Sequence, residues 1–134
     1  MANLTNQVAI VTGGSSGIGQ AIALRFAKDG AKVIITGRTE ATLKNASEAH
    51  ENITYQVADM TKTADIEALM DRVEKVYGRL DILVNNAGWC PVQPITEMKI
   101  EDYDRAFSLD VRALVEMTIH ALPLLRETKG KIIN

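Results

Sequence analysis

Five short apolar runs rich in β-branched residues recur along the chain, and a segment with helical periodicity separates each run from the next. The runs are apolar almost throughout instead of alternating with polar residues, which is the pattern of parallel strands covered on both faces. The sequence therefore predicts an α/β fold with a doubly wound parallel sheet, in which the chain ends just after the start of the fifth strand. The predicted strands are residues 8–11, 32–36, 53–57, 80–84 and 131–133.

The intervening segments carry the apolar stripes and stop signals of amphipathic helices. We expect a helix over residues 17–29 that stops at Gly30, and another that closes at Gly78. A helix between them is expected from Thr39, as its N-cap, to His50. The side chains expected in the core are Ile18, Ala21, Ile22, Phe26 and Ala27 from the first of these and Ile66, Leu69, Met70, Val73, Val76 and Tyr77 from the one that closes at Gly78.

The last helical segment, residues 100–125, is long for such a fold and contains Pro123 near its end, so we expect a kink or an early stop there. No repeat, low-complexity tract or linker-like change in composition divides the 134 residues. A single domain over residues 1–134 is predicted.

Composition and charge argue against several classes of function. Fifteen Lys and Arg against seventeen Asp and Glu give a net charge of −2, without a basic block, so nucleic acid is not an expected partner. The apolar runs fall far short of the roughly 20 residues that cross a bilayer, and the first residues do not resemble a signal peptide. A single cysteine, Cys90, suits a reducing compartment, so we expect a cytoplasmic protein without a membrane partner. His50 and His120 are isolated, and no metal site is predicted.

A glycine-serine loop, TGGSSGIG at Thr12–Gly19, joins the first predicted strand to the first predicted helix. In that position Gly13 suits a sharp turn, Gly17 lets the main chain approach a pyrophosphate, and Gly19 lets the helix pack close to the strand. The helix N-terminus offers free N–H groups to phosphates, and Ser15 and Ser16 add hydroxyl donors. Two alternatives are a nucleotide P-loop, which the missing lysine after Gly19 disfavours, and a flexible loop without a ligand.

The loop TGGSSGIG and the sequence NNAG at Asn85–Gly88 together resemble the two signatures of the short-chain dehydrogenase/reductase family, whose fold is of the Rossmann type. ADM at 58–60 and GRLDILVNNAG at 78–88 resemble it as well. The resemblance implies that the loop holds the pyrophosphate, with the Ile18 amide near the phosphates or the nicotinamide ribose. It further implies that Asp59 and Met60 flank the adenine, that Asn86, Ala87 and Gly88 line the middle of the cofactor, and that Asn85 serves the sheet. Strand-end turns are the alternative for the asparagines, and an ordinary turn is the alternative for Asp59.

The end of the second predicted strand bears on which dinucleotide is bound. An NAD site has a carboxylate at this point, whereas this chain has Gly37 followed by Arg38, whose guanidinium can bind a 2′-phosphate. The sequence therefore favours NADP(H) over NAD(H). Glu40 lies close enough to weaken this preference, and a solvated Arg38 without a ligand is the alternative.

Hydride transfer in the resembled family depends on a Ser, a Tyr and a Lys, the last two spaced as Y-x-x-x-K. None of the three tyrosines has a lysine four positions later: the residues there are Asp59, Asp81 and Phe107. We therefore expect the catalytic Ser, Tyr and Lys to lie outside this chain, and the chain alone to be inactive. Asp110 stands at the position of a family asparagine that supports a water-linked proton path, which makes it the one candidate catalytic residue. Local ion pairs, such as one with Arg112, are the alternative for Asp110.

The resemblance implies an oxidoreductase that interconverts small alcohols and ketones, with this chain supplying the cofactor site. The alternative is a non-catalytic dinucleotide-binding module or sensor. The family commonly pairs its subunits through the fourth helix, so a homo-oligomer formed through Ile100 to Leu125 is expected. Trp89 and Cys90 follow the second signature; packing is expected for them, and contact with the substrate is the alternative.

Overall fold

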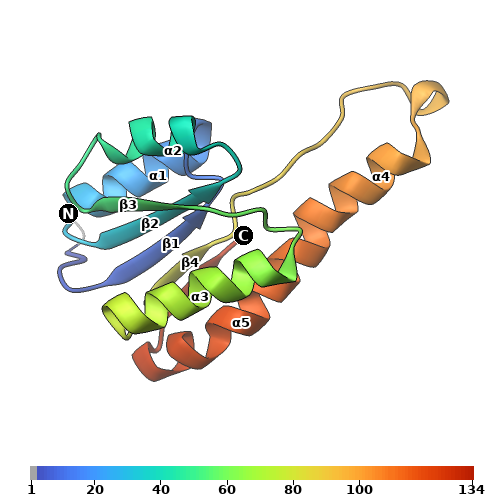
Figure 1. The fold of residues 1–134 in the computed structure, drawn as a ribbon. Helices are drawn as coiled ribbons and strands as arrows, with labels where there is room; N and C mark the ends of the chain where they lie inside the picture. The colour runs from blue at the N-terminus through green and yellow to red at the C-terminus, as the bar shows by residue number, and fades with distance from the viewer. Residues whose placement is uncertain (1–2) are drawn as a thin grey trace.

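The structure, a computed structural model, describes residues 3–134. Strands and helices alternate as predicted, up to the last helical segment (Figure 1). The strands are β1 (Val8–Thr12), β2 (Lys32–Gly37), β3 (Ile53–Val57), β4 (Ile82–Val84) and β5 (Lys131–Ile133). The helices are α1 (Gly17–Lys28), α2 (Glu40–Ser47), α3 (Thr63–Tyr77), α4 (Ile100–Phe107) and α5 (Ala113–Thr128), with a 3₁₀ turn at Ile95–Glu97 and a π-helical segment at Ser108–Arg112.

All five strands run parallel in the order β3-β2-β1-β4-β5, which confirms the predicted doubly wound sheet. The chain builds β1 to β3 toward one edge and then returns to place β4 on the other side of β1. Helices α1 and α2 cover one face of the sheet, and α3 and α5 cover the other (Figure 1). The reversal of direction lies between β1 and β4, where open α/β sheets bind their ligands.

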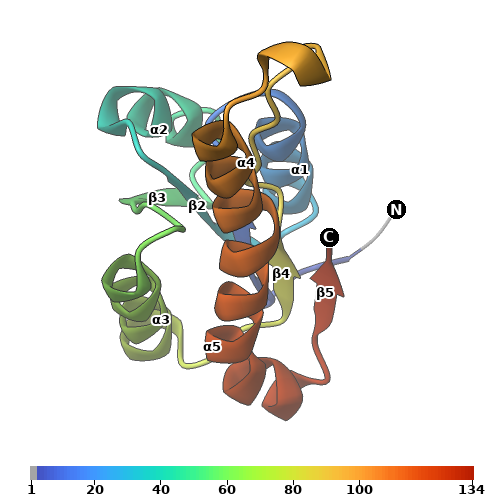
Figure 2. The ribbon, with the colours of Figure 1, turned by 90° about the vertical axis from the view of Figure 1, so that its right-hand side faces the viewer.

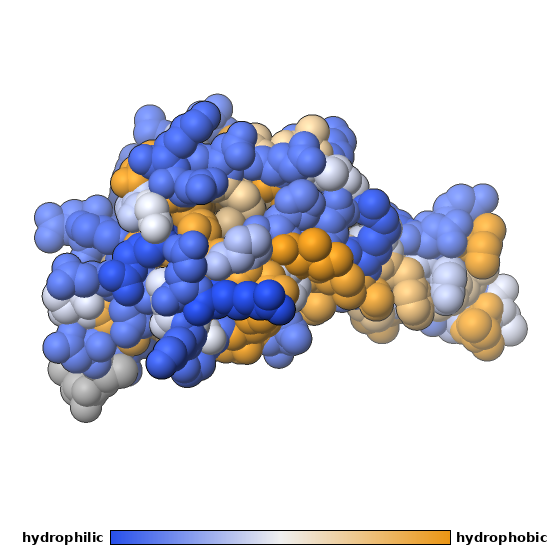
Figure 3. Space-filling view, turned by 90° about the horizontal axis from the view of Figure 1, so that it is seen from below, coloured by the Kyte–Doolittle hydropathy of each residue, from blue (hydrophilic) through white to orange (hydrophobic). Residues whose placement is uncertain are grey.

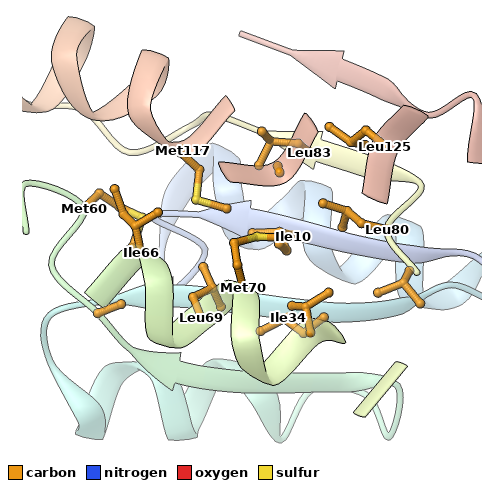
Figure 4. Packing of buried hydrophobic residues seen from close by; sticks show 14 of the residues in the cluster. Ile10, Ile34, Met60, Ile66, Leu69, Met70, Leu80, Leu83, Met117 and Leu125 are labelled. Carbon is orange, nitrogen blue, oxygen red and sulfur yellow. The ribbon is translucent and has the colours of Figure 1, made fainter. Parts of the chain in front are cut away.

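Each face of the sheet has its own apolar core. On the α3 and α5 side, Ile10, Ile34 and Leu83 pack against the buried residues of those helices, as Figure 4 shows. On the other side, Val11 and Ile35 pack against α1, whose buried residues are small: Gly19, Ala23 and Ala27. Parallel strands covered on both faces need apolar residues at successive positions, which accounts for the continuous apolar runs in the sequence.

The predicted helix ends are close to those observed. Gly30 and Gly78 have φ of +100° and +65°, which fits their predicted role in ending α1 and α3. Helix α2 starts after Thr39 as predicted, although the Thr39 side chain makes no capping hydrogen bond, and it ends at Ser47 instead of His50. Strand β4 begins at Ile82, two residues later than predicted.

Three side chains predicted for the core are exposed. Ile18, Ala21 and Val76 lie on the solvent side of their helices, with Ile18 at 75% and Val76 at 62% exposure. Helix α1 turns Ala23 and Ala27 toward the sheet, which places Ile18 beside the glycine loop. In α3 the buried line passes through Ile66, Leu69, Met70 and Val73, and Val76 flanks this line.

The segment predicted as one helix over 100–125 is divided. Helix α4 and helix α5 are joined by the π-helical segment Ser108–Arg112, and Pro123 lies inside α5, which continues to Thr128. The expected early stop at Pro123 is therefore wrong, because a proline removes only one helical hydrogen bond and the helix resumes after it. Helix α4 projects away from the sheet (Figures 1 and 2). Within residues 3–134, no helix combines the length and apolarity that a bilayer crossing requires.

Candidate functional site

A hollow of about 680 Å³ lies at the carboxyl ends of the strands, at the point where the strand order reverses. The segments that follow β1, β2, β3 and β4 all contribute to its wall. Its volume lies in the range typical of small-molecule and cofactor sites. The lining residues are Gly13, Ser15, Ser16, Gly17, Ile18, Thr36, Gly37, Arg38, Thr39, Thr42, Ala58, Asp59, Met60, Thr61, Asn86, Ala87, Gly88, Arg105 and Leu109.

The glycines of the loop after β1 have separate roles. Gly13 and Gly17 have φ of +63° and +54°, a region that favours glycine, and a Cβ at Gly17 would meet no atom within 4 Å. Gly17 therefore presents bare main chain to the hollow, and its predicted approach to a pyrophosphate stays a prediction. A Cβ at Gly19 would collide with Asn86 and the Gly13 carbonyl, so Gly19 is required for packing against the loop and Asn86 instead of the strand.

Close approach to a strand is the role of Gly14, which the sequence analysis missed. A Cβ at Gly14 would lie 2.6 Å from Cγ2 of Ile35 in β2, and the Gly14 amide donates to the Thr36 carbonyl oxygen at 3.1 Å. The sequence did contain a signal for this role: Gly14, the second glycine of TGG, is not one of the three glycines to which the dinucleotide pattern gives a role. Gly14 holds the loop flat against the end of β2.

The first turn of α1 offers hydrogen-bond donors to the hollow. The amides of Gly17, Ile18 and Gly19 donate no hydrogen bond within residues 3–134, and the first turn has no acidic residue. Ser16 is the N-cap residue, but its side chain makes no capping hydrogen bond. Free amides and the positive end of the helix dipole make this turn suitable for an anion.

Thr12 and Asn86 tie the loop to the end of β4. The Thr12 hydroxyl oxygen accepts hydrogen bonds from the amides of Asn86 and Ala87, both at 3.0 Å, and donates to the Val84 carbonyl at 3.3 Å. The Asn86 side-chain amide donates to the carbonyl oxygens of Thr12 and Gly13, both at 3.1 Å. Thr12 is buried and lies behind the wall of the hollow, so it positions the loop rather than lining the site.

Asn85 is joined to the sheet through its main chain, and its side chain bonds outside the sheet. Its amide N–H donates to the Ile133 carbonyl at 2.9 Å, and its side chain donates to Thr118 at 3.3 Å and to Asn134 at 2.9 Å. These contacts join β4 to α5 and to the end of β5. Asn85 is absent from the wall of the hollow.

At the end of β2, Gly37 and Arg38 line the hollow. Arg38 forms no ion pair within residues 3–134, and its side chain is exposed. Glu40 is not part of the wall, and its carboxylate accepts a hydrogen bond from the Tyr55 hydroxyl at 3.3 Å. Partial burial raises the pKa of Tyr55 above its usual value, and the Glu40 charge adds to the effect. Arg38 is therefore the only charged side chain at this end of β2 that faces the hollow.

In the turn after β3, Asp59 lines the hollow with a hydrogen-bonded carboxylate, whereas Met60 is mostly buried in the core. Asp59 accepts hydrogen bonds from the Thr61 hydroxyl at 2.6 Å and the Thr61 amide at 3.0 Å. The bond from the Thr61 hydroxyl lowers the pKa of Asp59, and the charges of Lys62 and Arg38 act in the same direction. Met60 is 5% exposed and packs beside Ile66 in the core (Figure 4), so only a small part of it reaches the hollow.

Asp110, the candidate catalytic residue, lies in the π-helical segment. Its Oδ1 accepts a hydrogen bond from the Trp89 amide at 2.7 Å, and a Cβ at Gly88 would lie 3.1 Å from the same oxygen. Arg112 pairs with Glu116 at 2.8 Å, so the alternative of an Asp110–Arg112 ion pair is wrong. Asp110 positions the segment that follows β4, which contributes Gly88 to the hollow.

Arg105 lines the hollow and is a charged residue that the sequence did not single out. Its guanidinium carbon lies 4.1 Å from the centre of the Trp89 ring, above the ring face. No sequence pattern singled it out, because α4 reads as a charged helix and its contact with Trp89 depends on the fold. The hollow thus has two arginines in its wall, Arg38 and Arg105, and one aspartate, Asp59.

Comparison with known proteins agrees with this geometry. A family model described as short chain dehydrogenase matches residues 7–134. The chain belongs to the short-chain dehydrogenase family. Uncharacterized oxidoreductases of Staphylococcus aureus strains MRSA252 and N315 are each 32% identical over the whole of this chain, and one from Staphylococcus epidermidis is 34% identical. The chain spans 59% of the length of each of these relatives. As a short-chain dehydrogenase it is an oxidoreductase by family, with a Rossmann-type sheet.

Proposed function

We propose that the hollow binds NAD(P)(H) and that this chain supplies the cofactor site of an enzyme that interconverts alcohols and ketones. The observation that carries the proposal is the first turn of α1, where the amides of Gly17 and Ile18, two residues of the wall of the hollow, donate no hydrogen bond within residues 3–134. This turn is at the reversal point of the sheet, where a pyrophosphate would be bound. When bound, the nicotinamide supplies hydride donation or acceptance.

The types of residue in the wall of the hollow support the proposal of a dinucleotide. The bare main chain of Gly17 and the exposed hydroxyl of Ser16 suit the pyrophosphate, while Asp59 suits the adenine end. Ala87 and Gly88, at the end of β4, suit the middle of the cofactor. Asp110 would keep this last segment in place through the Trp89 amide.

The proposed preference for NADP(H) rests on Arg38. Gly37 leaves no carboxylate where an NAD site places one, and the Glu40 carboxylate is turned to Tyr55. An unpaired guanidinium binds a phosphate through charge-assisted, bidentate hydrogen bonds.

Calorimetric titration of the 134-residue chain with NADP⁺ and NAD⁺ tests the proposal. We expect tighter binding of NADP⁺, and we expect Arg38→Gln to weaken NADP⁺ binding about tenfold without changing that of NAD⁺. Arg126→Gln, which removes an exposed arginine far from the wall of the hollow, is the matched control. Absence of binding by either dinucleotide would exclude the cofactor site, and equal loss for both would exclude the role of Arg38.

The alternative, a non-catalytic binding module, is tested by turnover. The sequence contains no Y-x-x-x-K, so we expect the 134 residues to bind the cofactor without oxidising an alcohol. An enzyme-like rate of NADPH formation by this chain would contradict that expectation. If a protein of the relatives' full length also binds the cofactor without turnover of any alcohol or ketone tested, the binding-module alternative is preferred.

We also propose that two copies of the chain pair through residues 100–125. Large apolar side chains recur on one side of this stretch at spacings of three and four residues and remain exposed: Ile100, Tyr103, Phe107, Val111, Val115 and Ile119. Figure 3 shows apolar surface that extends from the body of the molecule toward the projecting end. A continuous stripe of this spacing suits the same stripe of a second copy, through helix-on-helix packing.

A further inference from the structure

Arg105, on α4, lines the hollow but has no role in the proposed binding of the cofactor. Three charged side chains line the hollow: Arg38, Asp59 and Arg105. If Arg38 binds the 2′-phosphate, at the adenosine end of the cofactor, and Ala87 and Gly88 line its middle, the nicotinamide end would lie beyond Gly88, toward Trp89 and Arg105. Arg105 then remains as a positive charge at that end. The geometry points to Arg105 as a specificity residue that binds the carboxylate of an anionic keto acid or hydroxy acid substrate.

Arg105 is held in the wall of the hollow by its contact with Trp89. Its guanidinium carbon lies 4.1 Å from the centre of the Trp89 ring. The main chain of Trp89 is fixed, because its amide donates to Asp110 at 2.7 Å. A guanidinium that stacks on an aromatic ring uses its face for the contact, and its N–H groups, which lie in the guanidinium plane, stay free to donate.

Neighbouring carboxylates do not neutralise Arg105. Glu101 and Asp102 precede it by four and three residues on α4, which are the spacings at which helical ion pairs form. Asp102 instead accepts a hydrogen bond from the Gln93 side chain at 3.2 Å. Arg105 forms no ion pair with any carboxylate in residues 3–134. The cation that faces the hollow is therefore available to a ligand.

A carboxylate is the anion that best suits this position. The planar fork of arginine binds carboxylates and phosphates through two parallel hydrogen bonds. A keto acid places a carboxylate and a reducible carbonyl in one small molecule, so binding of the carboxylate at Arg105 would orient the carbonyl near the nicotinamide end. This inference rests on the proposed function, since it needs a dinucleotide in the rest of the hollow.

The test follows the emission of Trp89, the only tryptophan, in the 134-residue chain saturated with NADP⁺. The probes are pyruvate, acetoacetate and 4-oxopentanoate, in which the ketone and carboxylate are progressively further apart, each compared with its methyl ester. We expect at least one acid to bind about tenfold more tightly than its ester, as a charge-assisted hydrogen bond implies. Arg105→Gln should remove that difference, Arg105→Lys should restore part of it, and Arg126→Gln should leave it intact.

The outcomes separate the two proposals. Failure of both NADP⁺ and NAD⁺ to bind the wild-type chain overturns the proposed function and this inference together. Normal cofactor binding with no difference between any acid and its ester overturns the role of Arg105 alone. Weaker NADP⁺ binding by Arg105→Gln also overturns it, because Arg105 would then be a cofactor contact. Arg105 is exposed, and an unchanged circular dichroism spectrum of the variants checks that the fold is retained.

Discussion

Strands β1 and β5 belong to the same parallel sheet and have similar apolar sequences, but their burial is opposite. All five residues of β1 are buried, whereas all three residues of β5 are exposed. Strand β1 lies between β2 and β4 with helices on both faces, while β5 pairs with β4 alone. The comparison teaches that an apolar, β-branched run selects the strand conformation, and that neighbouring elements decide how much the strand contributes to stability.

The largest expected effect comes from equal truncations in the two strands. Ile10→Ala removes a fully buried side chain between α3 and the sheet and should lower the free energy of unfolding by about 3–4 kcal/mol. Ile133→Ala, at a residue 45% exposed, should lower it by less than about 1 kcal/mol. Urea denaturation of the two variants measures the difference. Equal losses would show that β5 is as well packed as β1.

Asp81 offers a second way to sharpen the comparison, because it contacts both strands. Its Oδ2 accepts a hydrogen bond from the Val8 amide at 2.9 Å, and its carbonyl oxygen accepts one from the Lys131 amide at 2.8 Å. Arg79 donates to the carboxylate at 2.7 and 2.9 Å. Asp81→Asn should lower the free energy of unfolding by about 2–3 kcal/mol, because a buried charged acceptor is lost.

The same residue predicts a pH dependence. Burial acts to raise the pKa of Asp81, but the hydrogen bonds from Arg79 and Val8 outweigh it and the pKa is lowered. An acid with a lowered pKa stabilises the fold above its unfolded-state pKa of about 4 and loses this contribution as the pH falls through the folded-state value. Wild-type stability should therefore decrease more steeply than that of Asp81→Asn below about pH 4. Parallel pH profiles from urea denaturation would contradict this.

Another prediction concerns the contact between the loop after β1 and the end of β2. Gly14→Ala places a methyl group 2.6 Å from the Ile35 side chain and should cost about 1–2 kcal/mol of unfolding free energy. Gly88→Ala serves as a comparison on the β4 side, where the added Cβ would lie 3.1 Å from Asp110 and the fit is less tight. Thermal or urea denaturation should rank Gly14→Ala as the less stable variant. The reverse order would place the tighter contact after β4.

The smallest expected effect on the fold itself comes from the exposed helical stripe. The double variant Val115→Glu with Ile119→Glu should raise the dissociation constant of a dimer at least about tenfold, while changing the stability of the monomer by less than about 0.5 kcal/mol. Both side chains are about half exposed or more. Sedimentation velocity measures the association. Glu101→Gln, on α4 within the same stretch of residues 100–125, is the control. A monomeric wild-type chain at all concentrations would remove the proposed pairing.

Much of the fold follows from local pattern. The sequence predicted the order of strands and helices, the ends of α1 and α3 and the position of the glycine loop. These features were predictable because β-branched runs and left-handed glycines set the conformation of the short segments in which they lie. The π-helical segment before α5 and the continuation of α5 past Pro123 were not predicted. No local residue pattern marks the first, and the second is supported by the packing of α5 against α3 and β4.

For the candidate site, the sequence predicted positions at which the residue type alone sets the shape of the main chain, and it missed positions that depend on contacts between distant segments. The bare approach at Gly17 follows from residue type, whereas Thr12 turned out to position the loop. Gly14 and Arg105 were missed, because the first is set by the distance to a neighbouring strand and the second by contact with Trp89, 16 residues earlier in the chain.

The hydroxyl of Thr12 has a consequence for how binding is transmitted. Because it accepts from the amides of Asn86 and Ala87 and donates to Val84, the loop after β1 and the segment after β4 cannot separate without losing all three bonds. A ligand whose phosphates bind at the first turn of α1 should therefore slow amide hydrogen exchange at Asn86 and Ala87, even where these two residues do not contact the phosphates. In a Thr12→Val variant the Asn86 side chain still donates to the carbonyls of Thr12 and Gly13, but the three hydroxyl bonds are lost, so the same ligand should protect Asn86 and Ala87 less than in the wild type.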